Sequence, residues 1–258
     1  MIFDGHEMAD TARVAREIAQ ALLEKRPLSL IALCDGESAT LWAGKGFQTF
    51  NYLAGFGIPG PEFVPAAEQL AAAIARTDIV CVPQSYQGKR NQYGAKVRES
   101  LELWDIELKP TALIGDAHVC WFLLFDMWLV GLLQRRRVLI VNNEADKVAN
   151  ALLTKTVPGP LKEWWPPNWI HVTGADAIML GEGLAGSAKA LHEVEALTEK
   201  PDIALVGAGA RSAHLVTSIA EMLSIPVIEL GAACLNFHRP FATQSGYDKM
   251  MALYQKEG

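Results

Sequence analysis

Two acidic residues separated by one glycine follow an apolar run early in the chain. Asp35, Gly36 and Glu37 come directly after residues 28–33, which have the composition of a buried strand. Gly36 permits a tight backbone path between the two carboxylates, which can share Mn²⁺ or Mg²⁺ with the oxygens of a diphosphate. Such an ion would neutralise charge on a departing phosphate. The same residues also fit a structural role, with Asp35 capping a following helix and Glu37 supporting its first turn.

A glycine-containing turn late in the chain is a second candidate site. Gly207 and Gly209 lie between a predicted strand and a predicted helix, where helix N-terminal amides bind phosphate and Arg211 could contact a phosphate oxygen. Glu229 follows at a spacing that partly imitates the dinucleotide-binding fingerprint, although Ser212 stands in place of its third glycine. A phosphate site and a purely structural tight turn therefore both remain open.

Three polar residues that follow other predicted strands are candidate general bases. Asp116 and His118 come after one apolar run, and Glu144 comes after another. Any of them could accept a proton from an acceptor hydroxyl, and we rank Glu144 and Asp116 above His118. A helix cap or a surface polar group is the alternative role for each.

The elements that must position these residues alternate between strands and helices. Strands separated by long helical segments need crossover connections, which produce a Rossmann-like α/β fold with a parallel sheet and helices on both faces. Ligands bind beyond the carboxyl ends of the strands in such sheets, where all the candidate residues fall. The predicted strands are residues 28–33, 79–82, 111–114, 137–141, 169–172, 203–206 and 227–230. The predicted helices are residues 9–23, 65–76, 93–104, 144–154, 187–197 and 211–223, with a further apolar helix within residues 117–133.

Length and composition fit one α/β domain over residues 1–258. Half of the residues are hydrophobic and a fifth are charged, which is typical of a compact globular chain. Residues 157–169 hold four prolines and three tryptophans, which exclude a regular element. This segment is the candidate for a lid or for a connection between lobes.

Charge and cysteine pattern exclude several other classes of protein. The formal net charge of −6 argues against binding to nucleic acid, which needs clustered basic residues. The four cysteines form no Cys-x-x-Cys pair, and the N-terminus lacks the pattern of a signal peptide, so we expect a cytoplasmic protein. The apolar residues 117–133 include His118 and Asp126 and predict a buried helix rather than a transmembrane segment. The sequence leaves a homo-oligomer open.

Three segments resemble the GT-D-type glycosyltransferases. The run Ser29-Leu-Ile-Ala-Leu-Cys-Asp-Gly-Glu37 is similar to the opening motif of that family, and residues 201–215 and 225–231 resemble its late strand, small-residue turn and following strand. The resemblance implies a metal-assisted transfer of a sugar from a nucleotide donor that depends on an Asp-x-Glu motif. It assigns metal and donor binding to Asp35 and Glu37.

The chain also departs from the family pattern. Ala32 and Cys34 replace an arginine and a glycine before the acidic pair, and Ala232 stands where the family has a histidine after the late glycine. His238 could replace that histidine as a metal ligand.

Our leading hypothesis is therefore a metal-dependent glycosyltransferase that uses Mn²⁺ or Mg²⁺, a nucleotide-diphosphate sugar and an acceptor that the sequence does not identify. The alternatives are an NAD(P)-dependent oxidoreductase that uses the Gly207-Ala-Gly209 turn, and a non-catalytic nucleotide-binding module.

Overall fold

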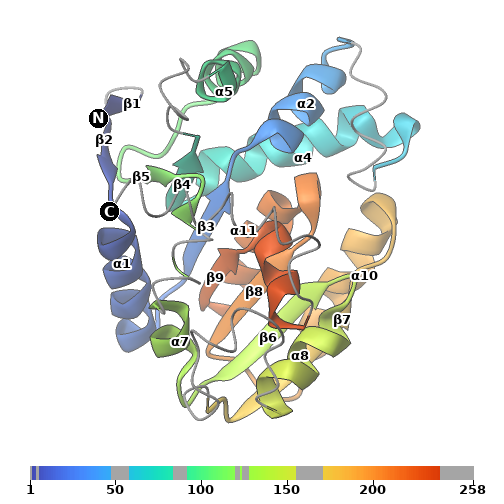
Figure 1. Cartoon of the computed structure of the whole chain (residues 1–258). Helices are drawn as coiled ribbons and strands as arrows, with labels where there is room; N and C mark the ends of the chain where they lie inside the picture. Colours follow the sequence, from blue (N-terminus) through green and yellow to red (C-terminus); the bar gives the residue numbers. More distant parts are fainter. Residues whose placement is uncertain are drawn as a thin grey trace, which may run out of the picture.

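The computed structural model describes residues 2–3, 6–47, 58–83, 92–119, 123, 128–154 and 171–238. Strands and helices alternate along the chain around a central sheet (Figure 1). The predicted α/β fold is confirmed.

Eight strands of the sheet, β2 to β9, run parallel, and β1 pairs with β2 in the antiparallel direction. The order across the sheet is β1-β2-β5-β4-β3-β9-β8-β6-β7. The strands are β1 Ile2–Phe3, β2 His6–Ala9, β3 Leu28–Ala32, β4 Ile79–Val82, β5 Leu113–Asp116, β6 Arg137–Asn142, β7 Gly174–Met179, β8 Ile203–Gly207 and β9 Pro226–Glu229.

Helices connect these strands. The α-helices are α1 Thr11–Glu24, α2 Asp35–Gly44, α4 Phe63–Arg76, α5 Gln92–Leu103, α7 Trp128–Leu133, α8 Ala145–Thr154, α10 Gly183–Glu195 and α11 Ser212–Leu223. Among the described residues, 3₁₀ segments accompany them: η2 Gly60–Glu62, η3 Gly209–Arg211 and η4 Gly231–Phe237.

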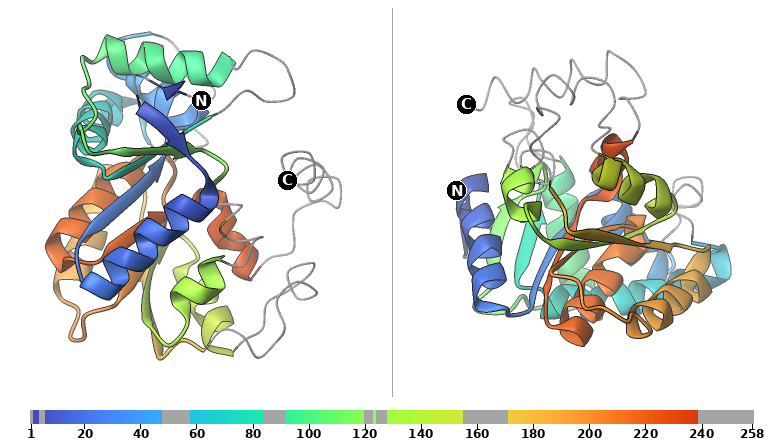
Figure 2. Two further views of the ribbon diagram at one scale, coloured as in Figure 1. Left: turned by 90° about the vertical axis from the view of Figure 1, so that its left-hand side faces the viewer. Right: turned by 90° about the horizontal axis from the view of Figure 1, so that it is seen from below.

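The helices form two layers, because right-handed crossovers place a connection on one face or the other according to its direction across the sheet. Helices α2, α4, α5, α10 and α11 cover the face that we call the α2 face. Helices α1, α7 and α8 cover the other face together with η4, and we call this the α8 face. The right-hand view of Figure 2 shows α8 and η4 on one side of the sheet and α10 and α11 on the other.

The carboxyl ends of β3 and β9 meet at a reversal of the chain direction. From β3 the chain moves towards β4, whereas from β9 it continues into η4, which packs against β8 and α8. Neighbouring strands whose connections leave in opposite directions open the crevice in which α/β proteins bind ligands. This rule places the expected ligand site beside the Asp-Gly-Glu motif that follows β3.

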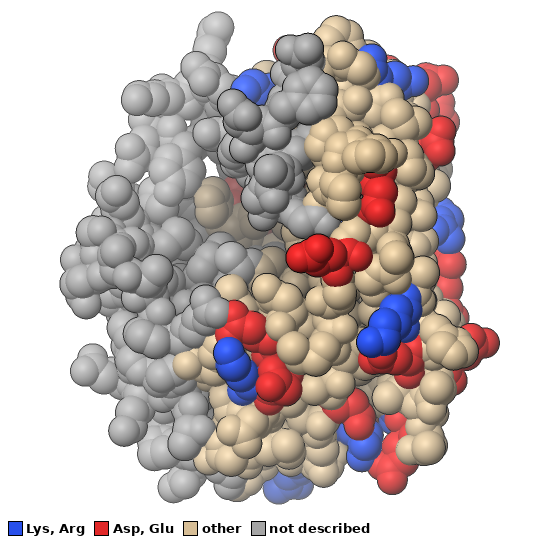
Figure 3. Space-filling view, turned by 90° about the vertical axis from the view of Figure 1, so that its right-hand side faces the viewer, with Lys and Arg blue, Asp and Glu red and all other residues tan. Residues whose placement is uncertain are grey.

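Surface charges of both signs are interspersed on the face that carries α10 and β7 (Figure 3). Arg137 at the start of β6 binds both carboxylate oxygens of Asp176 at 2.8 Å and also pairs with Glu199. This arrangement avoids a large field of one sign on that side.

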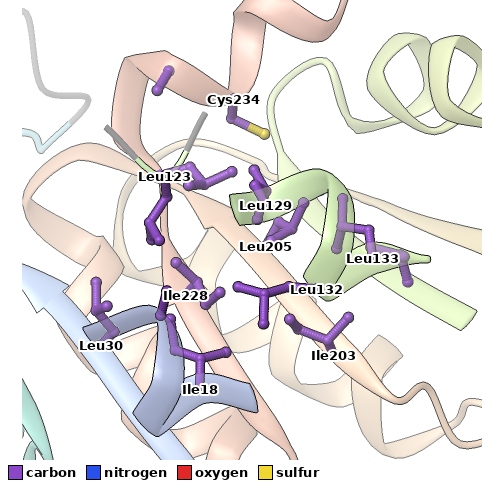
Figure 4. Close-up of a cluster of buried hydrophobic side chains, with 14 of the residues drawn as sticks. Ile18, Leu30, Leu123, Leu129, Leu132, Leu133, Ile203, Leu205, Ile228 and Cys234 are labelled. Carbon is purple, nitrogen blue, oxygen red and sulfur yellow. The ribbon is translucent and has the colours of Figure 1, made fainter. Parts of the chain in front are cut away.

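The core lies in two layers, because alternate residues of each strand point to opposite faces. On the α8 face Leu30, Leu205 and Ile228 pack against Ile18 of α1 and Leu132 of α7 (Figure 4). On the α2 face the intervening strand residues pack against α4, α5, α10 and α11. Strands buried on both faces explain the continuous apolar runs in the sequence.

Helix boundaries follow local chemistry as well as the core pattern. Asp10 caps α1 by accepting a hydrogen bond from the Arg13 amide at 2.6 Å, and the helix ends at Lys25 in the left-handed conformation.

Two predicted strands were misplaced. The strand predicted at 169–172 is Gly174–Met179, which forms the edge of the sheet, and the strand predicted at 111–114 is Leu113–Asp116. Strands β1 and β2 were not predicted, because their short, mixed sequence lacks a clear period. The candidate lid at 157–169 lies outside the described residues, as do residues 120–122 and 124–127 of the apolar segment 117–133. No helix in the described part of the chain is long and apolar enough to cross a membrane.

Candidate functional site

The Asp-Gly-Glu motif forms the first turn of α2 rather than a loop. Cys34 is the N-cap residue, and its amide donates a 2.8 Å hydrogen bond to Oε2 of Glu37. The Glu37 side chain is buried, with 6% of its surface exposed. The structural role considered for Glu37 is therefore present, whereas the side chain of Asp35 lies outside the described structure.

A second buried carboxylate, Glu229, lies beside Glu37. It ends β9, next to β3, and accepts a 3.0 Å hydrogen bond from the amide of Ala32. Burial raises the pKa of Glu229 well above its ordinary value, and the neighbouring charge of Glu37 raises it further. We call Glu37 and Glu229 the same-charge pair.

The late glycine turn is tied to this pair by a serine. The amide of Ala208 donates to the Ser212 hydroxyl at 2.9 Å, and that hydroxyl in turn binds Glu229. The residue that replaces the third glycine of a dinucleotide fingerprint therefore connects the turn to the carboxylates. Gly209 has φ +58°, which favours glycine.

Gly207 is required by packing. A Cβ at this position would lie 2.6 Å from Nδ2 of Asn142 and 2.8 Å from the carbonyl oxygen of Gly231. Asn142 uses the space by donating to the Gly207 carbonyl at 2.6 Å. The glycine thus permits close contact between the ends of β6, β8 and β9, and the structural reading of the turn holds at this position.

Arg211, the last residue of the turn, is held by two backbone carbonyl groups of another segment. Its Nη1 donates at 2.7 Å to the carbonyl oxygens of both Gly181, in the connection after β7, and Gly183, the first residue of α10. Burial lowers the pKa of Arg211, while the charges of Glu62 and Glu182 act to raise it. The structure therefore shows a packing role that the sequence did not indicate, and the predicted phosphate contact stays a prediction.

Glu62 fixes the same region from the start of α4. Its Oε2 accepts from the amide of Leu184 at 2.6 Å, at the N-terminus of α10. Gly183 has φ +61°, and a Cβ on it would lie 2.6 Å from that Glu62 oxygen. Three connections therefore meet at this point: η2 to α4, β7 to α10, and β8 to α11.

Asp116 and His118 contact each other at the end of β5. Oδ1 of Asp116 lies 2.8 Å from Nδ1 of His118 and also accepts from the His118 amide at 2.7 Å. Both side chains are partly exposed, at 17% for Asp116 and 28% for His118. Two residues that the sequence offered as separate candidate bases thus form one unit.

On the α8 face Glu144 lies close to Lys147, which is a cation, and to His238, which is a cation only when protonated. Its Oε2 is 3.1 Å from Nζ of Lys147 and 3.3 Å from Nε2 of His238, which follows η4. Within the described residues this Nε2 makes no hydrogen bond, so the imidazole is near Glu144 but not aligned with it. Burial, followed by the charge of Lys147, lowers the pKa of His238. We call Glu144, Lys147 and His238 the mixed cluster.

The candidate residues therefore fall into two groups at one edge of the sheet. The same-charge pair and Asp116 belong to the α2 face, since Ile114 and Val227 of the same strands pack there. The mixed cluster lies on the α8 face with η4 and α8. The predicted roles of Glu144 as a base and of His238 as a metal ligand stay predictions, and the structure brings these two residues to each other.

The donor chemistry beside α2 suits a hard divalent cation. In the described part of the chain no three His, Cys, Asp or Glu side chains come together as a metal site. Mg²⁺ at phosphate-binding sites, however, is commonly held by only one or two carboxylates together with substrate oxygens. The carboxylate of Glu37 is close enough to Glu229 to raise the pKa of Glu229. Asp35 begins the helical turn that contains Glu37.

Comparison with known proteins agrees with this architecture. A selenomethionine-substituted structure of the domain of unknown function 1792 has a TM-score of 0.59 at 12% identity, covering 95% of this chain and 82% of the other. A second structure of that domain, described as having a distinct glycosyltransferase fold, has a TM-score of 0.57 at 14% identity with the same coverage. A comparison with curated proteins found no match. Residues 9–237 match the family described as the GT-D fold-like domain, and the chain therefore belongs to that family of glycosyltransferase fold.

Proposed function

We propose that the protein is a metal-dependent glycosyltransferase that transfers a sugar from a nucleotide-diphosphate donor to an acceptor. The observation that carries the proposal is the placement of Asp35-Gly36-Glu37. This motif forms the first turn of α2, directly after β3. Strand β9 lies next to β3, and the connections that follow these two strands leave in opposite directions. Buried Glu229 lies beside the motif.

The proposal assigns the metal to Asp35 and Glu37. A divalent ion held by these two residues would supply positive charge to a departing nucleotide diphosphate. The N-terminus of α2 and the turn before α11 add amide dipoles that favour phosphate near the ends of β3 and β8. Ser212 and Glu229 hold that turn against the end of β3 through the Ala32 amide.

The geometry favours this function over dinucleotide binding. The acidic residue of a dinucleotide site binds a ribose hydroxyl. Glu229, the residue at the comparable spacing, is 4% exposed and binds Ala32 and Ser212 instead. Gly207 is accounted for by its contacts with Asn142 and Gly231.

Thermal unfolding with UDP, GDP and NADH, each with and without Mn²⁺, tests the proposal. A nucleotide diphosphate at a hundred times its Kd stabilises the protein by about 2.7 kcal/mol, and we expect this shift only when Mn²⁺ is present. Stabilisation by NADH that is independent of metal would instead support the oxidoreductase alternative.

Matched variants locate the effect. Asp35→Asn keeps the size of the side chain and removes its charge, so the Mn²⁺-dependent shift should disappear. Glu68→Gln makes the same change at an exposed position of α4 and should leave the shift intact. Release of UDP from UDP-glucose, UDP-galactose and UDP-N-acetylglucosamine then separates an enzyme from a module that binds without turnover.

A further inference from the structure

The contact between Asp116 and His118 has the form of an oriented base. A carboxylate bonded to Nδ1 of an imidazole holds the ring in the tautomer that has its proton on Nδ1. The other nitrogen, Nε2, then carries the lone pair. The single oxygen Oδ1 of Asp116 serves both Nδ1, at 2.8 Å, and the His118 amide, at 2.7 Å, so it fixes the backbone and the ring together.

The sheet places this unit at the same edge and on the same face as the acidic motif. The Leu33 amide donates to the carbonyl of Cys81, and the Ala117 amide donates to the carbonyl of Val82, so the ends of β3, β4 and β5 are aligned. Adjacent strands lie about 4.8 Å apart, which puts the end of β5 roughly 10 Å from the end of β3. Asp116 pairs with Val82, whose side chain packs on the α2 face.

We propose that His118 is the general base of the transfer reaction and that Asp116 is its positioning residue. The inference rests on the proposed function, because it assigns the acceptor side of the same site. Nε2 of His118 takes the proton of the acceptor hydroxyl while the acceptor oxygen forms a bond to the anomeric carbon. The bond from that carbon to the diphosphate oxygen breaks, and the nucleotide diphosphate leaves with the electron pair. The imidazolium, stabilised by Asp116, then returns its proton to solvent.

This assignment reverses the order that the sequence suggested. Asp116 has its Oδ1 engaged by His118 in two hydrogen bonds, so it acts through the ring. Glu144 lies on the α8 face with Lys147 and His238. His118 alone among the three candidate bases combines partial exposure, the α2 face and a carboxylate that orients it.

The tautomer is the first test, and it does not depend on activity. Nitrogen-15 NMR of the full chain, with His118 assigned by the signal that disappears in His118→Gln, should show the proton on Nδ1. Asp116→Asn retains an oxygen acceptor and should keep that tautomer, whereas Asp116→Ala should release it. A wild-type His118 with its proton on Nε2 overturns the proposal.

Turnover is the second test, with UDP release from the three UDP-sugars in Mn²⁺ as the probe. Removing a general base typically lowers kcat by about 10²–10⁴-fold, and we expect His118→Ala to do so without changing the Kd for UDP measured by calorimetry. Added imidazole should restore part of the activity of His118→Ala. Asp116→Asn should lower kcat by a smaller factor, again with the Kd for UDP unchanged.

A control and a binding measurement separate the two hypotheses. His192→Gln, at an exposed position of α10, should retain full activity. If wild-type protein binds neither UDP nor GDP with Mn²⁺, the proposed function fails and the base assignment fails with it. If wild-type protein binds and turns over while His118→Ala is equally active, only the base assignment is overturned.

Discussion

The same-charge pair and the mixed cluster lie at one edge of the sheet, yet their electrostatics differ. Glu144 contacts Lys147 and His238. The contact with His238 joins the end of η4 to the connection between β6 and α8. Glu229 is met by Glu37, and burial and repulsion together raise its pKa. Opposite charges stabilise a fold modestly, whereas buried like charges oppose it and concentrate at functional sites. This contrast supports our proposal that the same-charge pair belongs to the site, and the opposite charges of the mixed cluster are typical of a contact that stabilises the fold.

Removing the hydrogen-bond acceptor of the same-charge pair should have the largest effect. Glu229→Ala leaves the Ala32 amide and the Ser212 hydroxyl without their shared acceptor, and buried donors that lose a partner cost about 1–3 kcal/mol each. We expect a loss of about 3 kcal/mol in the free energy of unfolding, measured with urea. Glu229→Gln keeps a carbonyl acceptor and should lose less. A larger loss in Glu144→Ala than in Glu229→Ala would reverse the comparison.

A side chain added at Gly207, between the two groups, should lower the free energy of unfolding by somewhat less. Gly207→Ala forces Asn142 and the Gly231 carbonyl apart, and overpacking typically costs about 1–3 kcal/mol. Gly131→Ala is the matched control, because a Cβ there meets no atom within 4 Å and alanine favours helix α7. Urea denaturation should show a clear loss for the first variant and none for the second. Equal stabilities would mean that the strand ends separate easily.

Weakening the mixed cluster from its exposed side should have a small effect. The Lys147 side chain is 59% exposed, and exposed ion pairs contribute about 0.2–1 kcal/mol. Lys147→Met should therefore change the free energy of unfolding by less than about 1 kcal/mol. It should also raise the pKa of His238, because Lys147 acts to lower it. An unchanged His238 titration by NMR would show that the two charges are not coupled.

The two groups should give opposite slopes of stability against pH. Glu229 has a raised pKa, so the folded state retains a proton that the unfolded chain releases, and stability falls as pH rises above about 4.5. His238 has a lowered pKa, so the unfolded chain binds a proton first and stability falls as pH drops below about 6.5. Urea titrations across this range should show the first slope reduced in Glu229→Gln and the second in His238→Gln. If neither substitution changes its slope, these groups do not govern the pH dependence.

The sequence predicted the alternation of elements well, because strands buried on both faces and amphipathic helices have different apolar periods. The edge strand β7 was misplaced because its residues are mostly part-exposed or exposed, so it lacks the apolar run of a central strand. The positions of the turns after β3 and β8 were predicted, but not all of the residues that hold them. Cys34 was not foreseen as the N-cap of α2, since cysteine is an uncommon capping residue.

The candidate site was predictable in its positions but not in its partnerships. The rule that ligands bind beyond parallel strand ends selected the residues after β3 and β5, and Asp35 and Asp116 lie at those strand ends. Glu229 was considered only for its spacing after the glycine turn, not as a residue of this edge. Which side chains meet there depends on strand order, and the apolar periodicity of a sequence does not predict that order. The placement of β9 beside β3 pairs Glu229 with Glu37, although the two are far apart along the chain.

The contacts of Arg211 with Gly181 and Gly183 support the turn before α11 from a point away from the Asp-Gly-Glu motif. Arg211 binds the carbonyl oxygens of Gly181 and Gly183, and Gly183 has a left-handed conformation and lies against Glu62. These contacts join the connection between β7 and α10 to the start of α11. A genetic screen for inactive protein should therefore recover substitutions of Gly183 alongside those of Asp35. Their purified products would differ, with the former heat-labile and the latter folded but inert.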